Sequence, residues 1–75
     1  RVIMKVLSGG LKTAYQIAEE LIWVPEQGGV AFRDLAPLDR RLAVMETIAH
    51  LKLLTIENKV GNVNMDGVSF YLAKD

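Results

Sequence analysis

Residues 37–72 read PLDRRLAVMETIAHLKLLTIENKVGNVNMDGVSFYL and contain the two strongest structural signals of the chain. The first part predicts one long helix from about Pro37 to about Glu57, because proline suits the first helical turn and apolar residues recur at helical spacing. Asn58 tolerates the left-handed conformation in which many helices end. The last part alternates with a period of two around Asp66-Gly67, which predicts a β-hairpin that returns along residues 68–72.

The first residues predict a short helix. Residues 1–7 place Ile3, Val6 and Leu7 at helical spacing. The following Ser8-Gly9-Gly10 ends this helix, because glycine readily adopts the left-handed conformation of a helix C-terminus.

A second helix is predicted from a capping box. The Thr13 hydroxyl can accept the amide hydrogen of Gln16, whose side chain can reach back to the backbone of Thr13. This helix is expected to end near residues 22–23, before a valine-proline pair, and residues 24–36 are expected to form a loop.

Three helices followed by a two-stranded wing are the winged-helix architecture, a variant of the helix-turn-helix. The sequence therefore predicts an α+β, mainly α, winged helix that occupies residues 1–75 as a single domain. A short extended piece at residues 11–13 could add a third strand beside the wing.

Length and composition exclude several classes of protein. Seventy-five residues make one small domain, and because the chain opens at Arg1 we expect the C-terminal fragment of a longer chain. A hydrophobic share of 51% and a charged share of 24% exclude a disordered tail. The absence of cysteine excludes disulfides, cysteine zinc sites and thiol catalysis. No apolar run has the length of a bilayer span and no signal peptide opens the chain, so we expect a cytoplasmic protein without membrane contact.

The charge distribution disfavours nucleic acid as a partner. Nine basic residues balance nine acidic ones, and no segment forms a strongly basic stripe. Arg40-Arg41 is the only adjacent basic pair, and a solvated helix end explains it better than a phosphate clamp. Under the alternative of a DNA-binding regulator domain, Arg40 and Arg41 would contact phosphates together with Lys52 and Lys59.

The predicted long helix carries two apolar faces. One face is expected to consist of Val44, Ile48, Leu51 and Thr55, with Thr47 and Leu54 flanking it. The second consists of Leu38, Leu42, Met45, Ala49 and Leu53. A groove-reading helix would need polar side chains there, so this face predicts protein packing. Two interpretations of what buries this second face remain open. Either a partner domain or subunit packs on it, or the 24–36 loop folds over it with Trp23, Phe32 and Leu35.

Glu46 and His50 are the most plausible chemical pair, because residues four apart share a helix face. A glutamate and a histidine could form half of a metal site or a general-acid pair. However, the sequence has no second histidine or cysteine to complete a site. A local hydrogen bond or an interface contact is the favoured interpretation, and we predict no catalytic residue, metal ligand or cofactor in this chain.

Several residues together resemble a known family. The opening motif is Gly10-x-x-Thr13-x-x-x-Ile17-Ala18-x-x-Leu21, and the central motif is Leu42-Ala43-Val44-x-Glu46-Thr47-x-Ala49-His50-Leu51-x-x-Leu54. Asn58-Lys59-Val60 is similar to the Gly-Lys-Val that usually follows. These motifs resemble the C-terminal winged-helix domain attached to metallo-β-lactamase-fold hydrolases.

The resemblance implies a non-catalytic accessory domain of a metal-dependent hydrolase. Its partner would be the N-terminal catalytic domain of the same parent chain, which would carry a His-x-His-x-Asp-His motif and a pair of zinc or similar metal ions. The domain would help to shape access of substrate to that site. We expect the contact at Leu42, Met45, Ala49 and Leu53, with Glu46 and His50 at its edge. A homodimerisation module that uses the same face is a further alternative.

Overall fold

The computed structural model describes residues 2–23 and 28–74. In chain order the elements are α1 (Val2–Leu7), β1 (Lys12–Thr13), α2 (Ala14–Glu19), β2 (Ile22–Trp23), β3 (Val30–Ala31), the 3₁₀ helix η2 (Phe32–Asp34), α3 (Pro37–Ile56), β4 (Val60–Met65) and β5 (Val68–Ala73).

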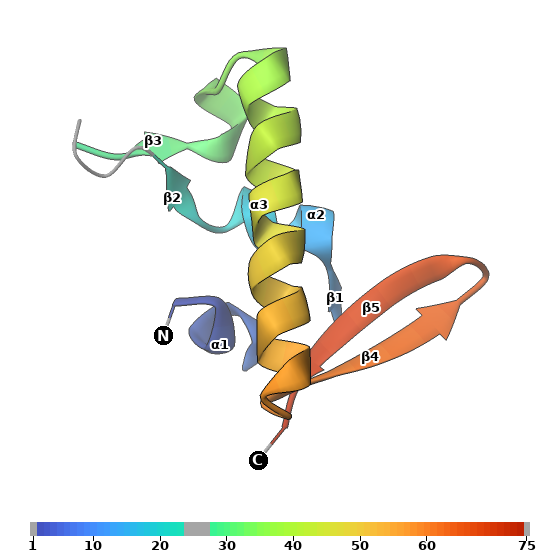
Figure 1. Cartoon of the computed structure of the whole chain (residues 1–75). Coiled ribbons are helices and arrows are strands. Elements are labelled where there is room, and N and C mark those ends of the chain that lie inside the picture. The colour runs from blue at the N-terminus through green and yellow to red at the C-terminus, as the bar shows by residue number, and fades with distance from the viewer. Residues whose placement is uncertain (1, 24–27, 75) are drawn as a thin grey trace.

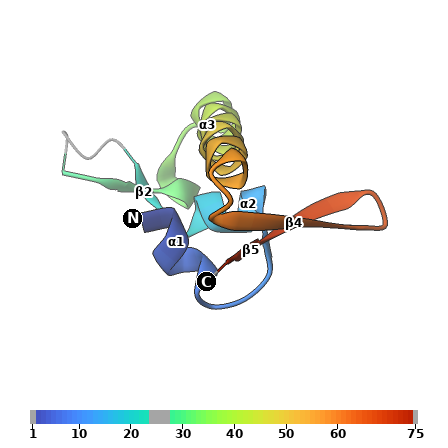
Figure 2. The ribbon, with the colours of Figure 1, turned by 60° about the horizontal axis from the view of Figure 1, so that its bottom comes forward.

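The strands form two separate antiparallel sheets. β5 lies between β1 and β4 in a three-stranded sheet, in which Lys12 pairs with Tyr71. β2 and β3 form a two-stranded sheet in which Ile22 pairs with Ala31. Both views of the ribbon place α3 over α1 and α2, with the β4–β5 hairpin on one side of α3 and the β2–β3 hairpin on the other (Figures 1 and 2).

The predicted fold class is wrong in its architecture. The sequence predicted a winged helix in which three helices precede one hairpin. The structure is a small α+β domain whose described residues form three α-helices and five strands in two sheets, and a winged helix is not shown. Three of the strands lie before α3, and each is two residues long. Such strands are too short to show alternation in the sequence, so β2 and β3 were not predicted, and β1 was expected only as a possible extended piece at residues 11–13.

The local signals of the sequence are confirmed. α3 begins at Pro37 and is capped by Glu57, and Asn58 has a φ of 62° in the left-handed region. The turn between β4 and β5 places Asp66 and Gly67 at φ values of 52° and 80°, as a tight hairpin turn requires. The capping box of α2 forms in both directions, and the expected extended piece beside the hairpin is β1.

The end of α2 differs from the prediction. The helix stops at Glu19, and Ile22 and Trp23 form β2 instead of a last helical turn. The indole Nε1 of Trp23 donates a hydrogen bond to the carbonyl of Ala18 at 3.1 Å, which holds the chain folded back across the end of the helix. The predicted 24–36 loop contains β3 and η2, and its residues 24–27 lie outside the described residues.

The core consists of two clusters that α3 connects. The first is Ile3, Leu7, Ile17, Leu51, Leu54 and Val60, and the second is Ala18, Phe32 and Ala43. Thr47 is also fully buried, and its hydroxyl donates to the carbonyl of Ala43 at 2.9 Å, so no polar group is left unpaired there.

The buried face of α3 is therefore rotated from the predicted one. Its members are Ala43, Thr47, Leu51 and Leu54, whereas Ile48 is 42% exposed. The sequence could not choose between neighbouring faces because apolar residues surround most of the helix, and the packing partners make the choice.

Replacing Leu54 by alanine should lower the free energy of unfolding by about 2–5 kcal/mol, because it removes a fully buried side chain and leaves a cavity. The neighbouring Leu53 is 49% exposed, and Leu53→Ala should change it by only about 0.5 kcal/mol. Urea unfolding followed by circular dichroism measures both. Equal losses in the two variants would contradict the assigned faces.

Candidate functional site

The most prominent surface feature is an apolar face of α3 that points away from the core, here called the α3 outer face. Its large members are Leu38 (66% exposed), Leu42 (53%), Met45 (62%), Leu53 (49%) and Ile56 (76%), with the smaller Ala49 also exposed. Isolated exposed apolar residues are ordinary, but a continuous stripe on one helix is typical of an interaction site. All four predicted docking residues, Leu42, Met45, Ala49 and Leu53, belong to this face.

The described part of the predicted loop does not cover the α3 outer face. Phe32 is buried with Ala18 and Ala43, and Leu35 and Val44 pack against the same cluster. Phe32 also meets the ring of Tyr15 edge to face, with 5.3 Å between ring centroids. The aromatic residues thus fill the groove between α2 and α3 instead of closing over the outer face.

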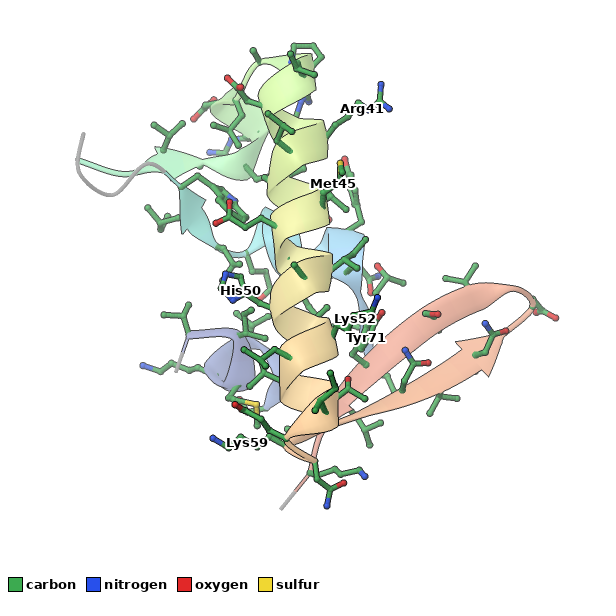
Figure 3. The ribbon with its side chains drawn as sticks, in the orientation of Figure 1. Arg41, Met45, His50, Lys52, Lys59 and Tyr71 are labelled. Carbon is green, nitrogen blue, oxygen red and sulfur yellow. The ribbon has the colours of Figure 1, made fainter. Side chains whose placement is uncertain are left out.

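Charged residues border the α3 outer face with opposite signs. At about 100° per residue, Arg41 and Lys52 lie on one edge of the face and Glu46 and Glu57 on the other. Figure 3 shows Arg41, Met45 and Lys52 on the same side of α3, and His50 on the opposite side. The face therefore has one basic and one acidic border.

Glu46 and His50 line a cavity of about 440 Å³ between α1, β2 and α3. The rest of its lining is Val2, Ile3, Glu20, Leu21, Ile22, Trp23 and Thr47. Within residues 2–23 and 28–74, no hydrogen bond or ion pair links Glu46 to His50, so of the two favoured interpretations the local hydrogen bond is not formed and the interface contact stays a prediction. Glu46 and His50 thus form part of a cavity wall. The sequence did not predict this cavity, because residues 22–23, which form β2, were assigned to the end of the second helix.

The described residues contain no group of three or more histidine, aspartate or glutamate side chains that could hold a metal ion.

The four predicted phosphate contacts do not form one cluster. Arg40 and Arg41 line a cavity near the start of α3 together with Tyr15. Lys52 lies in the middle of the helix, at a smaller cavity beside Tyr71. Lys59 follows the end of α3, where its Nζ lies 3.7 Å from the carboxylate of Glu57. Figure 3 shows Arg41, Lys52 and Lys59 spread along the length of the helix.

Comparisons with known protein families, with curated proteins and with solved structures found no match. No helix in the described ranges combines the length and the apolar character needed to cross a bilayer.

The exposure of Met45 predicts fast oxidation. In dilute chain treated with hydrogen peroxide, Met45 should form sulfoxide roughly threefold or more faster than the half-buried Met4, because oxidant must reach the sulfur. Peptide mass spectrometry measures both rates, and the exposed Met65 is the positive control. Protection of Met45 to the level of Met4 in dilute chain would show that the α3 outer face is covered from within.

Proposed function

We propose that this chain is a non-catalytic accessory domain that docks through the α3 outer face onto another protein domain. The observation that carries the proposal is the row of five large apolar side chains on α3, each about half exposed or more. Burying such a stripe against a partner removes apolar surface from water, which is the main driving force of protein association.

The proposed partner is the catalytic domain of a metallo-β-lactamase-fold hydrolase. Support for this partner is the resemblance of the Gly10–Leu21 and Leu42–Leu54 motifs to the domain appended to such enzymes. In this proposal the pair of zinc or similar metal ions belongs to the catalytic domain. The role of this chain is to pack beside that domain and help shape the access of substrate.

A protein partner fits the α3 outer face better than a nucleic acid. Base edges and phosphates are bound by arginine, lysine, asparagine and glutamine side chains. The α3 outer face presents leucine, methionine and isoleucine, and its basic residues are limited to one border. Its other border carries Glu46 and Glu57, which would repel phosphates.

Leu42→Asp should leave the isolated chain folded, with its melting temperature changed by only about 2 °C, because the side chain lies outside the core. In the longer protein the same change should weaken docking and lower the melting temperature of the assembly, and Met45→Glu should act alike. Leu11→Asp, an exposed leucine outside α3, is the matched control. Unfolding of the isolated Leu42→Asp chain would place the stripe in the domain's own core and defeat the docking proposal.

The partner is tested separately by the coding sequence upstream of Arg1. A His-x-His-x-Asp-His motif in the same reading frame supports the hydrolase partner. An upstream region that encodes a domain without such a motif removes that partner but leaves docking through the α3 outer face to be tested by the leucine variants.

A second candidate function is homodimerisation, which one specific observation favours. Glu46 stands five positions after Arg41, and Glu57 five after Lys52. When two helices pack in parallel, a residue on one border faces the partner's opposite border about five positions later. Two parallel copies of α3 would therefore join their apolar stripes and pair basic with acidic borders on both sides, with the small Ala49 near the centre of the contact.

Charge exchange tests the homodimer. Arg41→Glu or Glu46→Arg alone should weaken self-association at least about tenfold, because each homodimer then contains two like-charge pairs. An equimolar mixture of the two variants should restore it, because every pair is again of opposite sign. Sedimentation equilibrium measures the association, and Lys5→Glu on α1 is the control. A mixture that associates no better than the separate variants would contradict parallel pairing.

A further inference from the structure

We propose that the cavity between α1, β2 and α3 is a binding site for a small organic cation, a ligand with an apolar body and one ammonium group. The site lies beside the α3 outer face and shares Glu46 with the acidic border of that face. It lies on the side of α3 where Figure 3 places His50. The inference goes beyond the docking function and does not depend on it.

The cavity has the size and the lining of a small-molecule site. Its volume of about 440 Å³ falls within the range of roughly 300–1,000 Å³ that ligand pockets occupy. Apolar side chains from three elements form its walls: Val2 and Ile3 from α1, Ile22 and Trp23 from β2, and Leu21 between α2 and β2. Such walls accept an aromatic or aliphatic body.

The polar atoms of the walls are mostly engaged with the protein. Trp23 directs its indole N–H to the carbonyl of Ala18, so the ring is fixed in place and offers no donor to a ligand. The Thr47 hydroxyl donates to the carbonyl of Ala43. Glu20 forms an ion pair with Lys12 at 3.2 Å. The interior therefore provides shape and apolar contact without a free hydrogen-bond donor from these groups.

Among the described lining residues, the polar side chains of Glu46 and His50 make no hydrogen bond or ion pair, and the Glu46 carboxylate is the one that can select a cation. In the described part of the chain Glu46 makes no hydrogen bond or ion pair through its side chain, and it lies one turn before His50 on the same wall. Glu46 and Glu20 are the two carboxylates among the described lining residues, of which Glu20 is already paired with Lys12, and these described lining residues include no lysine or arginine. A carboxylate and an indole ring that line the same cavity favour an ammonium group, which can gain from both the charge and the ring face.

The sequence supplies a reporter for this site, because Trp23 is the one tryptophan of the chain. Titration with 2-phenylethylammonium at about pH 8 should change the Trp23 fluorescence with a Kd of about 1 mM, as expected for a ligand of this size. The uncharged analogue 2-phenylethanol should bind about tenfold more weakly. No response to either compound, or equal affinity for both, would overturn the proposal.

Variants separate this site from the docking surface. Glu46→Gln should reduce the affinity for 2-phenylethylammonium to that for 2-phenylethanol. Glu57→Gln removes a carboxylate of α3 outside the cavity and should have no effect. Leu42→Asp should also bind 2-phenylethylammonium unchanged, even if it abolishes docking. Loss of ammonium binding in Leu42→Asp would assign the signal to the α3 outer face and overturn the proposal.

A lysine side chain of a partner carries the same chemistry, so a further titration uses N-acetyl-lysine N-methylamide. Weaker binding of this peptide mimic than of 2-phenylethylammonium supports a small-molecule ligand. Tighter binding would assign the cavity to a peptide side chain and overturn the small-molecule assignment.

Discussion

Burial of a single face of α3 is the constraint on which the rest of the structure depends. Ala43, Thr47, Leu51 and Leu54 lie on that face, and both core clusters include residues from it. A chain of 75 residues can bury only about 60% of the surface that its unfolded form exposes. The short helices and strands therefore suffice to cover one side of a 20-residue helix and leave its other sides in contact with solvent.

The two candidate sites are consequences of this arrangement. The α3 outer face is apolar although nothing within the described residues covers it, which is costly for a protein in water unless a partner covers it. The cavity lies between α1, β2 and α3, where these elements do not pack fully against one another. Glu46 and His50 line it together with apolar side chains. The α3 outer face favours a large, flat partner and the cavity a small ligand, and Glu46 belongs both to the acidic border of that face and to the cavity lining.

Helix and hairpin boundaries that depend on neighbouring residues could be predicted from the sequence. Thr13 with Gln16, Pro37, Asn58, and Asp66 with Gly67 each mark a helix or hairpin boundary that the structure confirms. The spacing placed Leu42 and Met45 on one face of the helix but did not decide whether residues 24–36 cover that face.

Most features that depend on contacts between different elements were not predicted, although β1 was expected beside the hairpin. β2 forms because Trp23 pairs with Val30 and its indole reaches back to Ala18, and neither contact leaves a local signal in the sequence. The architecture was assigned wrongly for the same reason. The cavity also escaped prediction, because its walls come from α1, β2 and α3, and no spacing along the chain brings these elements together.

The β4–β5 hairpin is anchored at its base and along the part of β5 that pairs with β1, where Thr13 lies opposite Phe70. Val60 is buried in the core, the backbone N–H of Lys74 donates to the carbonyl of Lys59 at 2.9 Å, and its ammonium group donates to the side chain of Asn58 at 2.7 Å. From Asn62 to Val68 the residues are exposed. The length of the outer hairpin is thus uncoupled from the stability of the core, and sequence inserted at its tip would be tolerated there. This tip is where the domain can acquire an additional recognition element without refolding.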